Sequence, residues 1–218
     1  MHKLGIMLAL SLAASASAGT ILTYNIIGVT DGAGMSQNYG DRVNGPSDAV
    51  GSYGTDNGTY TPNVVATRGG SPTIWTTGYG NLTNVHYNDD EGGDMTLTLT
   101  ADPGFLVTLS SFDLAAFSSD QTIPNTAITV RDGNGNLLFN VNGPLVVSAT
   151  TRNSFTPNVS AQSLILRIHV GQLINASDNN ALDNVLFSQQ TADTVPEPAT
   201  WGLMAGALTA LFWRRRAR

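Results

Sequence analysis

Cysteine is absent from the 218-residue chain, and positive charge is scarce in its interior. A domain without disulfides must be held together by its hydrophobic core. Residues 19–195 contain five arginines, no lysine and fifteen acidic residues, which gives this segment a net charge of −10. Because so acidic a surface repels phosphate backbones, the composition argues against a nucleic-acid-binding protein.

Catalytic residue types are also few. Nucleophilic catalysis needs a nucleophile beside a base, but there is no cysteine and no Gly-x-Ser-x-Gly turn, and His86 and His169 are the only histidines after residue 18. His86 precedes an acidic run, where a metal or base role is one interpretation. Glycoside hydrolysis needs two carboxyl groups; Asp113 and Asp183 could pair, but no signature selects them. We expect no enzymatic activity.

Long helical patterns are lacking, whereas Gly, Thr, Asn and Ser alternate with Val, Ile and Leu, as in strands joined by tight turns. Alternation is clearest over 95–100 and 164–170, which predicts strands with one buried face. We expect one all-β domain over 19–192, an antiparallel β-sandwich or jelly roll. The predicted strands span 20–29, 64–67, 82–87, 95–101, 105–112, 127–130, 137–141, 145–150, 164–170 and 181–188.

The segment 128–139 predicts a β-hairpin, because its Asp-Gly and Asn-Gly pairs supply the positive φ angles of tight turns. From Asp132 the sequence also copies the first half of an EF-hand calcium loop. That loop requires Gly at its sixth position and Glu at its twelfth, where this chain has Leu137 and Gly143. The hairpin is therefore the better interpretation.

Residues 30–63 form a polar stretch that is too long for a turn and contains three tyrosines, Tyr39, Tyr53 and Tyr60. Ordered loops of this length are often functional. The alternative is that the tyrosines cover the edge of the core, and the sequence leaves both interpretations open.

The first 18 residues have the features of a secretion signal. His2 and Lys3 are followed by an apolar run over 4–14 and by small residues over 15–18. We expect signal peptidase to cleave between Ala18 and Gly19. The alternative is an N-terminal core helix, but no amphipathic stripe is visible.

Residues 193–218 have the order of a membrane-sorting tail. Pro196-Glu197-Pro198 ends any preceding strand, and the apolar stretch 199–213 would form a helix of roughly 22 Å, shorter than a hydrocarbon core of roughly 30 Å. The cluster Arg214-Arg215-Arg216 should stay in the cytoplasm, with Trp201 and Trp213 at the two interfaces.

This tail resembles the PEP-CTERM sorting domain of Gram-negative bacteria, with its Pro-Glu-Pro, its short apolar helix and its terminal arginines in order. The resemblance implies that the chain is held transiently in the inner membrane, processed by an exosortase, and placed at the cell surface or in the extracellular polysaccharide layer. A plain single-pass tail anchor is the alternative.

Two patterns suggest ligands for the domain. Residues 181–188 resemble the closing strand of galactose-binding-like jelly rolls, which implies that Asp183 helps to hold Ca²⁺; alternatively, Asp183 and Asn184 bond neighbouring amides. Trp75 is the only tryptophan in 19–192, and Tyr79 follows it closely. Both are candidate stacking platforms for a carbohydrate, although a single Trp is often part of the core.

We therefore expect an exported β-sandwich protein of the surface or extracellular matrix, non-catalytic and structural or adhesive in the envelope or exopolysaccharide layer. One alternative is a Ca²⁺-dependent, lectin-like carbohydrate-binding module. A second is a hydrolase that acts on surface glycans.

Overall fold

The computed structural model describes residues 18–87, 94–123, 128–142, 144–169 and 180–192. The predicted secretion signal, the sorting motif and the predicted C-terminal helix lie outside these residues. Within them every regular element is a strand, so the expected all-β class is confirmed. No helix in the described part of the chain is long and apolar enough to cross a bilayer.

The larger of two main sheets has nine strands, and all its pairings are antiparallel. Its main path runs β13-β8-β16-β6-β5-β2; β1 pairs with β16 and β3, and β14 pairs with β8. The bounds are β1 Ala18–Ile26, β2 Ala33–Gly34, β3 Gly51–Thr55, β5 Thr73–Trp75, β6 Val85–Tyr87, β8 Phe105–Ala116, β13 Asn153–Phe155, β14 Val159–Ala161 and β16 Asn180–Thr191.

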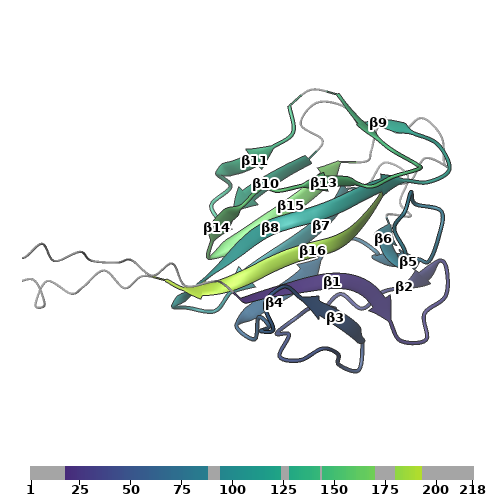
Figure 1. Cartoon of the computed structure of the whole chain (residues 1–218). Coiled ribbons are helices and arrows are strands. Elements are labelled where there is room, and N and C mark those ends of the chain that lie inside the picture. Colours follow the sequence, from purple (N-terminus) through teal and green to yellow (C-terminus); the bar gives the residue numbers. More distant parts are fainter. Residues whose placement is uncertain (1–17, 88–93, 124–127, 143, 170–179, 193–218) are drawn as a thin grey trace, which may run out of the picture.

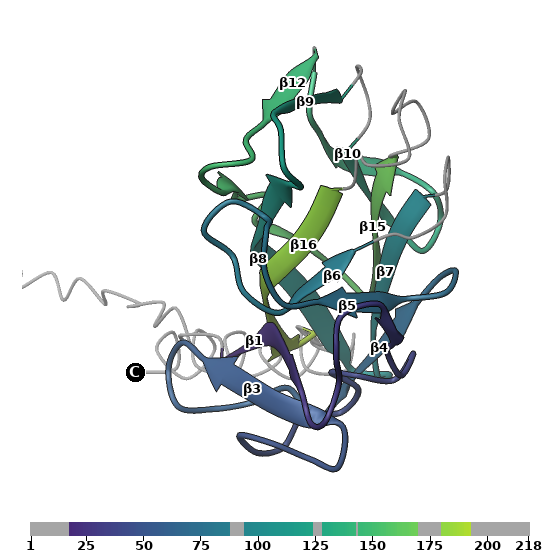
Figure 2. The same cartoon turned by 90° about the vertical axis from the view of Figure 1, so that its right-hand side faces the viewer.

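The second sheet has five antiparallel strands in the order β11-β10-β15-β7-β4. They span β4 Val64–Arg68, β7 Asp94–Ala101, β10 Ile128–Asp132, β11 Leu137–Asn140 and β15 Ser163–His169, and a separate pair joins β9 Gln121–Ile123 to β12 Leu145–Val147. The two main sheets form the layers of a sandwich, seen nearly edge-on in Figure 2. The first and last strands, β1 and β16, are neighbours (Figure 1).

Alternating side chains build the core between the layers. In β7, Met95, Leu97 and Leu99 are buried while the threonines between them are half-buried. β15 follows the same alternation, and opposite them β8 and β16 contribute Leu109 and Phe187, both without solvent exposure. The period-2 pattern in the sequence therefore predicted these strands correctly.

The predicted hairpin is present as β10 and β11, and the Asp132 carboxylate organises its turn. Asp132 Oδ1 accepts hydrogen bonds from the amides of Asn134 and Asn136, at 2.9 and 2.8 Å, and Oδ2 accepts one from the Asn136 side chain. Gly135 has φ 85°, which favours glycine. The carboxylate therefore stabilises the turn. This agrees with the interpretation of the segment as a β-hairpin and not as an EF-hand calcium loop.

The polar stretch 30–63 contributes to the core. It contains β2 and β3, and β3 pairs with β1. Tyr39 and Tyr53 are 0% and 7% exposed and lie in the main core cluster, with Tyr60 half-buried against it. The Tyr39 hydroxyl donates to the Ser52 carbonyl oxygen at 2.9 Å. Tyr39 and Tyr53 are therefore part of the core itself, whereas the sequence suggested at most that the tyrosines cover the edge of the core.

Replacing Tyr39 with Ala should lower the free energy of unfolding by about 3–5 kcal/mol, the range for removing a buried aromatic ring. Tyr60→Ala is the matched control and should lower it by much less, because that ring is only half-buried. Urea unfolding followed by circular dichroism measures both. Equal losses for the two variants would contradict the placement of Tyr39 in the core.

Candidate functional site

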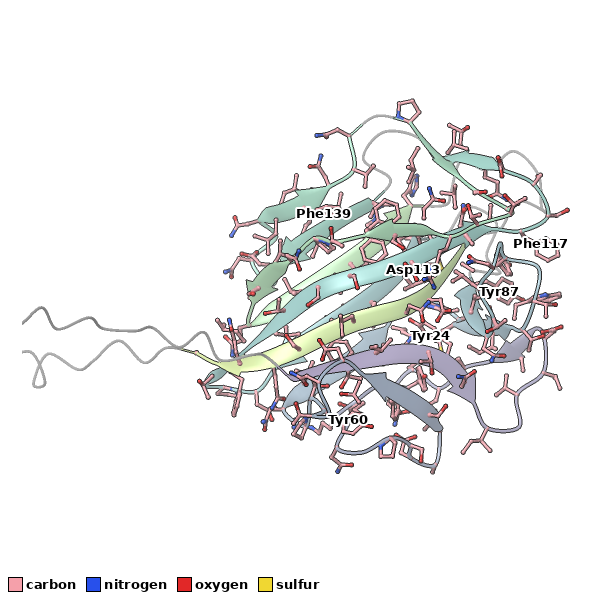
Figure 3. The ribbon with its side chains drawn as sticks, viewed as in Figure 1. Tyr24, Tyr60, Tyr87, Asp113, Phe117 and Phe139 are labelled. Atoms are coloured by element: carbon pink, nitrogen blue, oxygen red, sulfur yellow. The ribbon has the colours of Figure 1, made fainter. Side chains whose placement is uncertain are left out.

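A row of polar side chains crosses the outer face of the nine-stranded sheet, on the side that faces away from the sandwich core. Asp113 of β8 and Asp183 of β16 are register partners, and Ser154 of β13 is the partner of Asp113 on its other side. Their neighbours Leu114 and Leu182 belong to the main core cluster, so strand alternation turns the two carboxyl groups outward. Asp113 is labelled on β8 in Figure 3.

Asp113 is only 7% exposed, and both of its carboxylate oxygens have partners. Ser154 Oγ donates to Oδ1 at 2.6 Å, and Asn184 Nδ2 donates to Oδ2 at 2.9 Å. A nitrogen of the Arg152 guanidinium lies 3.4 Å from Oδ2, and this arginine side chain is half exposed. The acid is therefore held by neutral donors and by one cation that reaches it from solvent.

Asp183 has a different environment, although it lies opposite Asp113. It is 4% exposed, and its Oδ1 accepts a hydrogen bond from the Asn184 amide at 2.6 Å. Burial, with a smaller contribution from the negative charge of Asp113, raises the pKa of Asp183 to about 8. Asn184 has φ 49°, and the register of β16 shifts after Asp183. At neutral pH this carboxyl group is therefore largely protonated and neutral.

Beside the carboxyl pair lies an aromatic cluster formed by Trp75, Tyr79, Tyr87 and Phe117. Trp75 meets the rings of Tyr87 and Phe117 edge-on, at centroid distances of 5.5 and 6.0 Å. Tyr79 is 5.2 Å from Phe117 and 6.3 Å from Tyr87. In sequence, Ala115 lies two residues beyond Asp113 and Ala181 two residues before Asp183; both alanines belong to the same buried group as Tyr79 and Tyr87. The cluster and the carboxyl pair therefore share one face of the sheet.

Two loop segments, 76–84 and 148–152, meet beside this face. The Arg152 amide donates to Asn81 Oδ1 at 2.9 Å. A Cβ atom on Gly80 would come within 3.0 Å of the Thr151 backbone, and Gly80 has φ 54°, so this close approach requires glycine. Asp31, from the start of the 30–63 stretch, accepts hydrogen bonds from the amide and hydroxyl of Thr76. Segments from three parts of the chain thus meet in this region, and one of them directly follows Trp75.

The structure distinguishes the two predicted stacking residues. Trp75 is half-buried, whereas Tyr79 is 1% exposed. Tyr79 packs against Phe117 and Tyr87 within the cluster. The predicted sugar contact can involve only Trp75 of these two.

The two histidines lie apart from this face. His86 is 3% exposed, and its ring is 5.7 Å from that of Tyr24, a residue of the main core cluster. His169 Nδ1 lies 2.5 Å from Asp94 Oδ1, half-buried at the end of β15. Neither histidine joins Asp113 or Asp183 in a cluster.

Among the described residues, the surroundings of Asp183 supply few of the oxygen ligands that calcium takes. Calcium takes six to eight oxygen ligands, but Asp113 already accepts bonds from Ser154 and Asn184 and has the Arg152 cation beside it. Among the described residues no group of three or more His, Asp or Glu side chains could hold a metal ion. The bond from the Asn184 amide agrees with the alternative interpretation, in which Asp183 caps its own strand.

The sequence contains Asp113 and Asp183 as a possible pair but no signature that selects them. They are brought together by the register of β8 and β16, which are separated by more than 60 residues of chain. Ser154 and Arg152 could not be found, because β13 has only three residues and no alternating pattern. The sorting residues Pro196, Glu197 and Pro198 lie outside the described part of the chain.

Comparison with known proteins identifies the tail. Residues 194–216 match the PEP-CTERM protein-sorting motif. Among curated proteins, none matches this sequence. Similar solved structures include the CBM22-1 xylan-binding domain of Paenibacillus barcinonensis Xyn10C, with 17% identity, a TM-score of 0.34, and coverage of 58% of this chain and 86% of that domain. Another, described as a CBM4 structure, has 13% identity, a TM-score of 0.31, and coverage of 60% and 97%.

The motif determines the destination of the protein. Proteins that carry it are exported, processed at the cell envelope by an exosortase and displayed at the surface, and this chain is therefore an exported surface protein.

Replacing Asp183 with Asn tests the raised pKa. The folded state keeps a proton that the unfolded chain loses near pH 4, so this group's contribution to stability is present below pH 4 and is lost as the pH rises to about 8. Wild type should therefore lose up to a few kcal/mol of unfolding free energy across that window, relative to the Asp183→Asn variant.

The Asp56→Asn variant makes the same substitution at an exposed position and serves as the control; it should keep the pH dependence of the wild type. Urea unfolding at intervals from pH 4 to pH 9 gives the three curves. Parallel curves for wild type and Asp183→Asn would show that burial does not hold the proton on this group.

Proposed function

We propose that this exported domain is a non-catalytic module that holds extracellular polysaccharide on the outer face of its nine-stranded sheet. The observation that carries the proposal is the position of Trp75 and Phe117, both half-buried, beside the polar row of Ser154, Asp113 and Asp183. Sugars present apolar C–H faces and rings of hydroxyl groups, so they are retained by aromatic surface with hydrogen-bonding groups next to it.

The placement of this face within the domain supports the proposal. β1 begins and β16 ends at one end of the sandwich, whereas Tyr87 and Phe117 lie at the other (Figure 3). The sorting motif follows β16 in the sequence, and the last residues of β16 and the aromatic cluster are at opposite ends of the domain. A domain attached at its tail would therefore present Trp75 and Phe117 away from the point of attachment.

Charge favours a neutral or cationic glycan. The segment 19–195 has a net charge of −10, which repels uronic-acid and sulfated polymers at low salt. Arg152 is the exception on this face, because its half-exposed guanidinium lies next to Asp113. A glycan hydroxyl could bond to this cation without displacing the buried contacts of Asp113.

The proposal predicts that the exported protein retains polysaccharide on a glycan array and that Trp75→Ala reduces retention at least tenfold. Trp75→Phe keeps an aromatic ring with less area and should lose only part of the binding. Tyr60→Ala removes a half-buried ring elsewhere and should bind like wild type. Retention unchanged in Trp75→Ala, with its fold verified by circular dichroism, would contradict the proposal.

Calcium dependence is tested in the same assay by adding EDTA. Because Ser154, Asn184 and Arg152 already surround Asp113, the geometry supports binding that survives the chelator. Loss of retention in EDTA, restored by Ca²⁺, would instead support the lectin-like alternative with Asp183 as a ligand.

Glycan hydrolysis is a second candidate, supported by one observation. Two carboxyl groups face each other, and the pKa of Asp183 is raised to about 8 by its burial, as a general acid requires. Against it, Asp113 and Asp183 are 7% and 4% exposed, and the oxygens of Asp113 are already hydrogen-bonded. Release of reducing ends from polysaccharide by wild type, abolished in Asp183→Asn, would favour this second function.

The sorting tail gives a separate prediction. Replacing Pro196 and Pro198 together with Ala should keep the chain in the inner membrane, because the exosortase would no longer meet its motif. Fractionation with mass spectrometry of the C-terminus measures the outcome, and Ala199→Ser, just outside the Pro-Glu-Pro, is the control. Normal release of the double variant would contradict exosortase processing at this motif.

A further inference from the structure

The side chain of Arg68 is enclosed in the core of the sandwich. It ends β4, is 1% exposed, and is the largest of the fully buried side chains. Its Nη1 donates to the Tyr39 carbonyl oxygen. Within the described residues it has no ion pair, and its Nε and Nη2 atoms have no hydrogen-bond partner. A buried arginine is normally paired with a carboxylate, so this arrangement leaves a cation without its counter-charge.

Two tyrosine rings flank the guanidinium and account for part of its stability. The Arg68 Cζ atom is 5.4 Å from the centroid of Tyr24 and 5.2 Å from that of Tyr39, distances at which a cation is attracted to a ring face. Neither ring gives Nε or Nη2 a well-formed hydrogen bond.

Further unpartnered polar atoms lie in the same neighbourhood. The Tyr24 hydroxyl and His86 Nδ1 are both buried without a hydrogen-bond partner, and the two rings are 5.7 Å apart. Arg68 lies close enough to the Tyr24 hydroxyl to lower its pKa as a hydrogen-bond donor, but no contact between them has the geometry of a well-formed hydrogen bond. With the two Arg68 nitrogens, this makes four buried polar atoms on three adjacent side chains that lack a well-formed hydrogen bond. Buried polar groups almost always have partners, so a cluster of four indicates a bound species between them.

The protonation states show what charge that species should have. Burial lowers the pKa of His86 to about 3, with the Arg68 charge as a smaller cause, so the imidazole is neutral. Burial raises the pKa of Tyr24, and Arg68 only partly offsets this, so the phenol keeps its proton. The cluster therefore carries one positive charge from Arg68. A water molecule could accept the hydrogen bonds but would leave the charge uncompensated.

We propose that Arg68 Nε and Nη2, with the Tyr24 hydroxyl and the His86 ring, form an internal site for one monovalent inorganic anion of halide size. Arg68, Tyr24, Tyr39 and His86 are all 3% exposed or less, so the site is closed to glycans and other large anions. The ligand is structural: it neutralises a charge on the inner side of β6, the strand whose outer side bears Tyr87.

The exported protein is unfolded by heat in sodium chloride, sodium bromide and sodium gluconate at one ionic strength. An anion that binds only the folded state raises the folding equilibrium constant about 100-fold at 100 times its Kd. Wild type should therefore melt several degrees higher in chloride or bromide than in gluconate. Arg68→Met removes the cation and should abolish the difference, whereas Arg131→Met, at an exposed position, should retain it.

Anomalous diffraction from crystals grown in bromide decides the case even if Arg68→Met fails to fold. A bromide peak within hydrogen-bond reach of Arg68 Nε in wild type is the expected result. Density for ordered water alone at these atoms would overturn the proposal. Equal halide dependence in wild type and Arg68→Met would overturn it as well.

Discussion

The pairing of β16 with three other strands is the constraint on which both faces of the domain depend. It bonds to β8 along nearly its whole length, to β6 near its start, and to β1 from Val185 onward. Its inner side places Leu182 and Phe187 in the core, and its outer side carries Ala181 and Asp183. Because β16 is also the last strand before the sorting tail, the larger sheet is incomplete until nearly the whole domain has been exported.

The irregularity after Asp183 connects this architecture to the candidate site. β16 changes its neighbour from β6 to β1 between Leu182 and Val185, and its register with β8 shifts after Asp183. The shift leaves Asn184 at positive φ, with its amide bonded to Asp183 and its side chain bonded to Asp113. The bulge that lets one strand join three partners thus also sets two carboxyl groups side by side. Burial raises the pKa of Asp183 and keeps it protonated, and this also relieves the repulsion that two adjacent carboxylates would have.

The sequence predicted those strands and turns whose conformation depends on residues close together in the chain. Alternation predicted β7 and β15, and the Asp-Gly and Asn-Gly pairs predicted the β10–β11 hairpin. The short strands β2, β3, β5, β9, β13 and β14 were missed, because two to five residues cannot show a period. The Asp113–Asp183 pair and the burial of Arg68 depend on tertiary register, which a single sequence does not reveal. The tail was recognisable because its three features occur in a fixed linear order.

Binding of polysaccharide to the outer face of the β8–β16 pair can be tested by amide hydrogen exchange of the exported protein. Exchange is followed with and without the exopolysaccharide of the producing cell. Bound polysaccharide should slow exchange over residues 73–84, 113–117 and 148–155 and leave the five-stranded sheet unchanged. No change on that face, or protection confined to the five-stranded sheet, would contradict it.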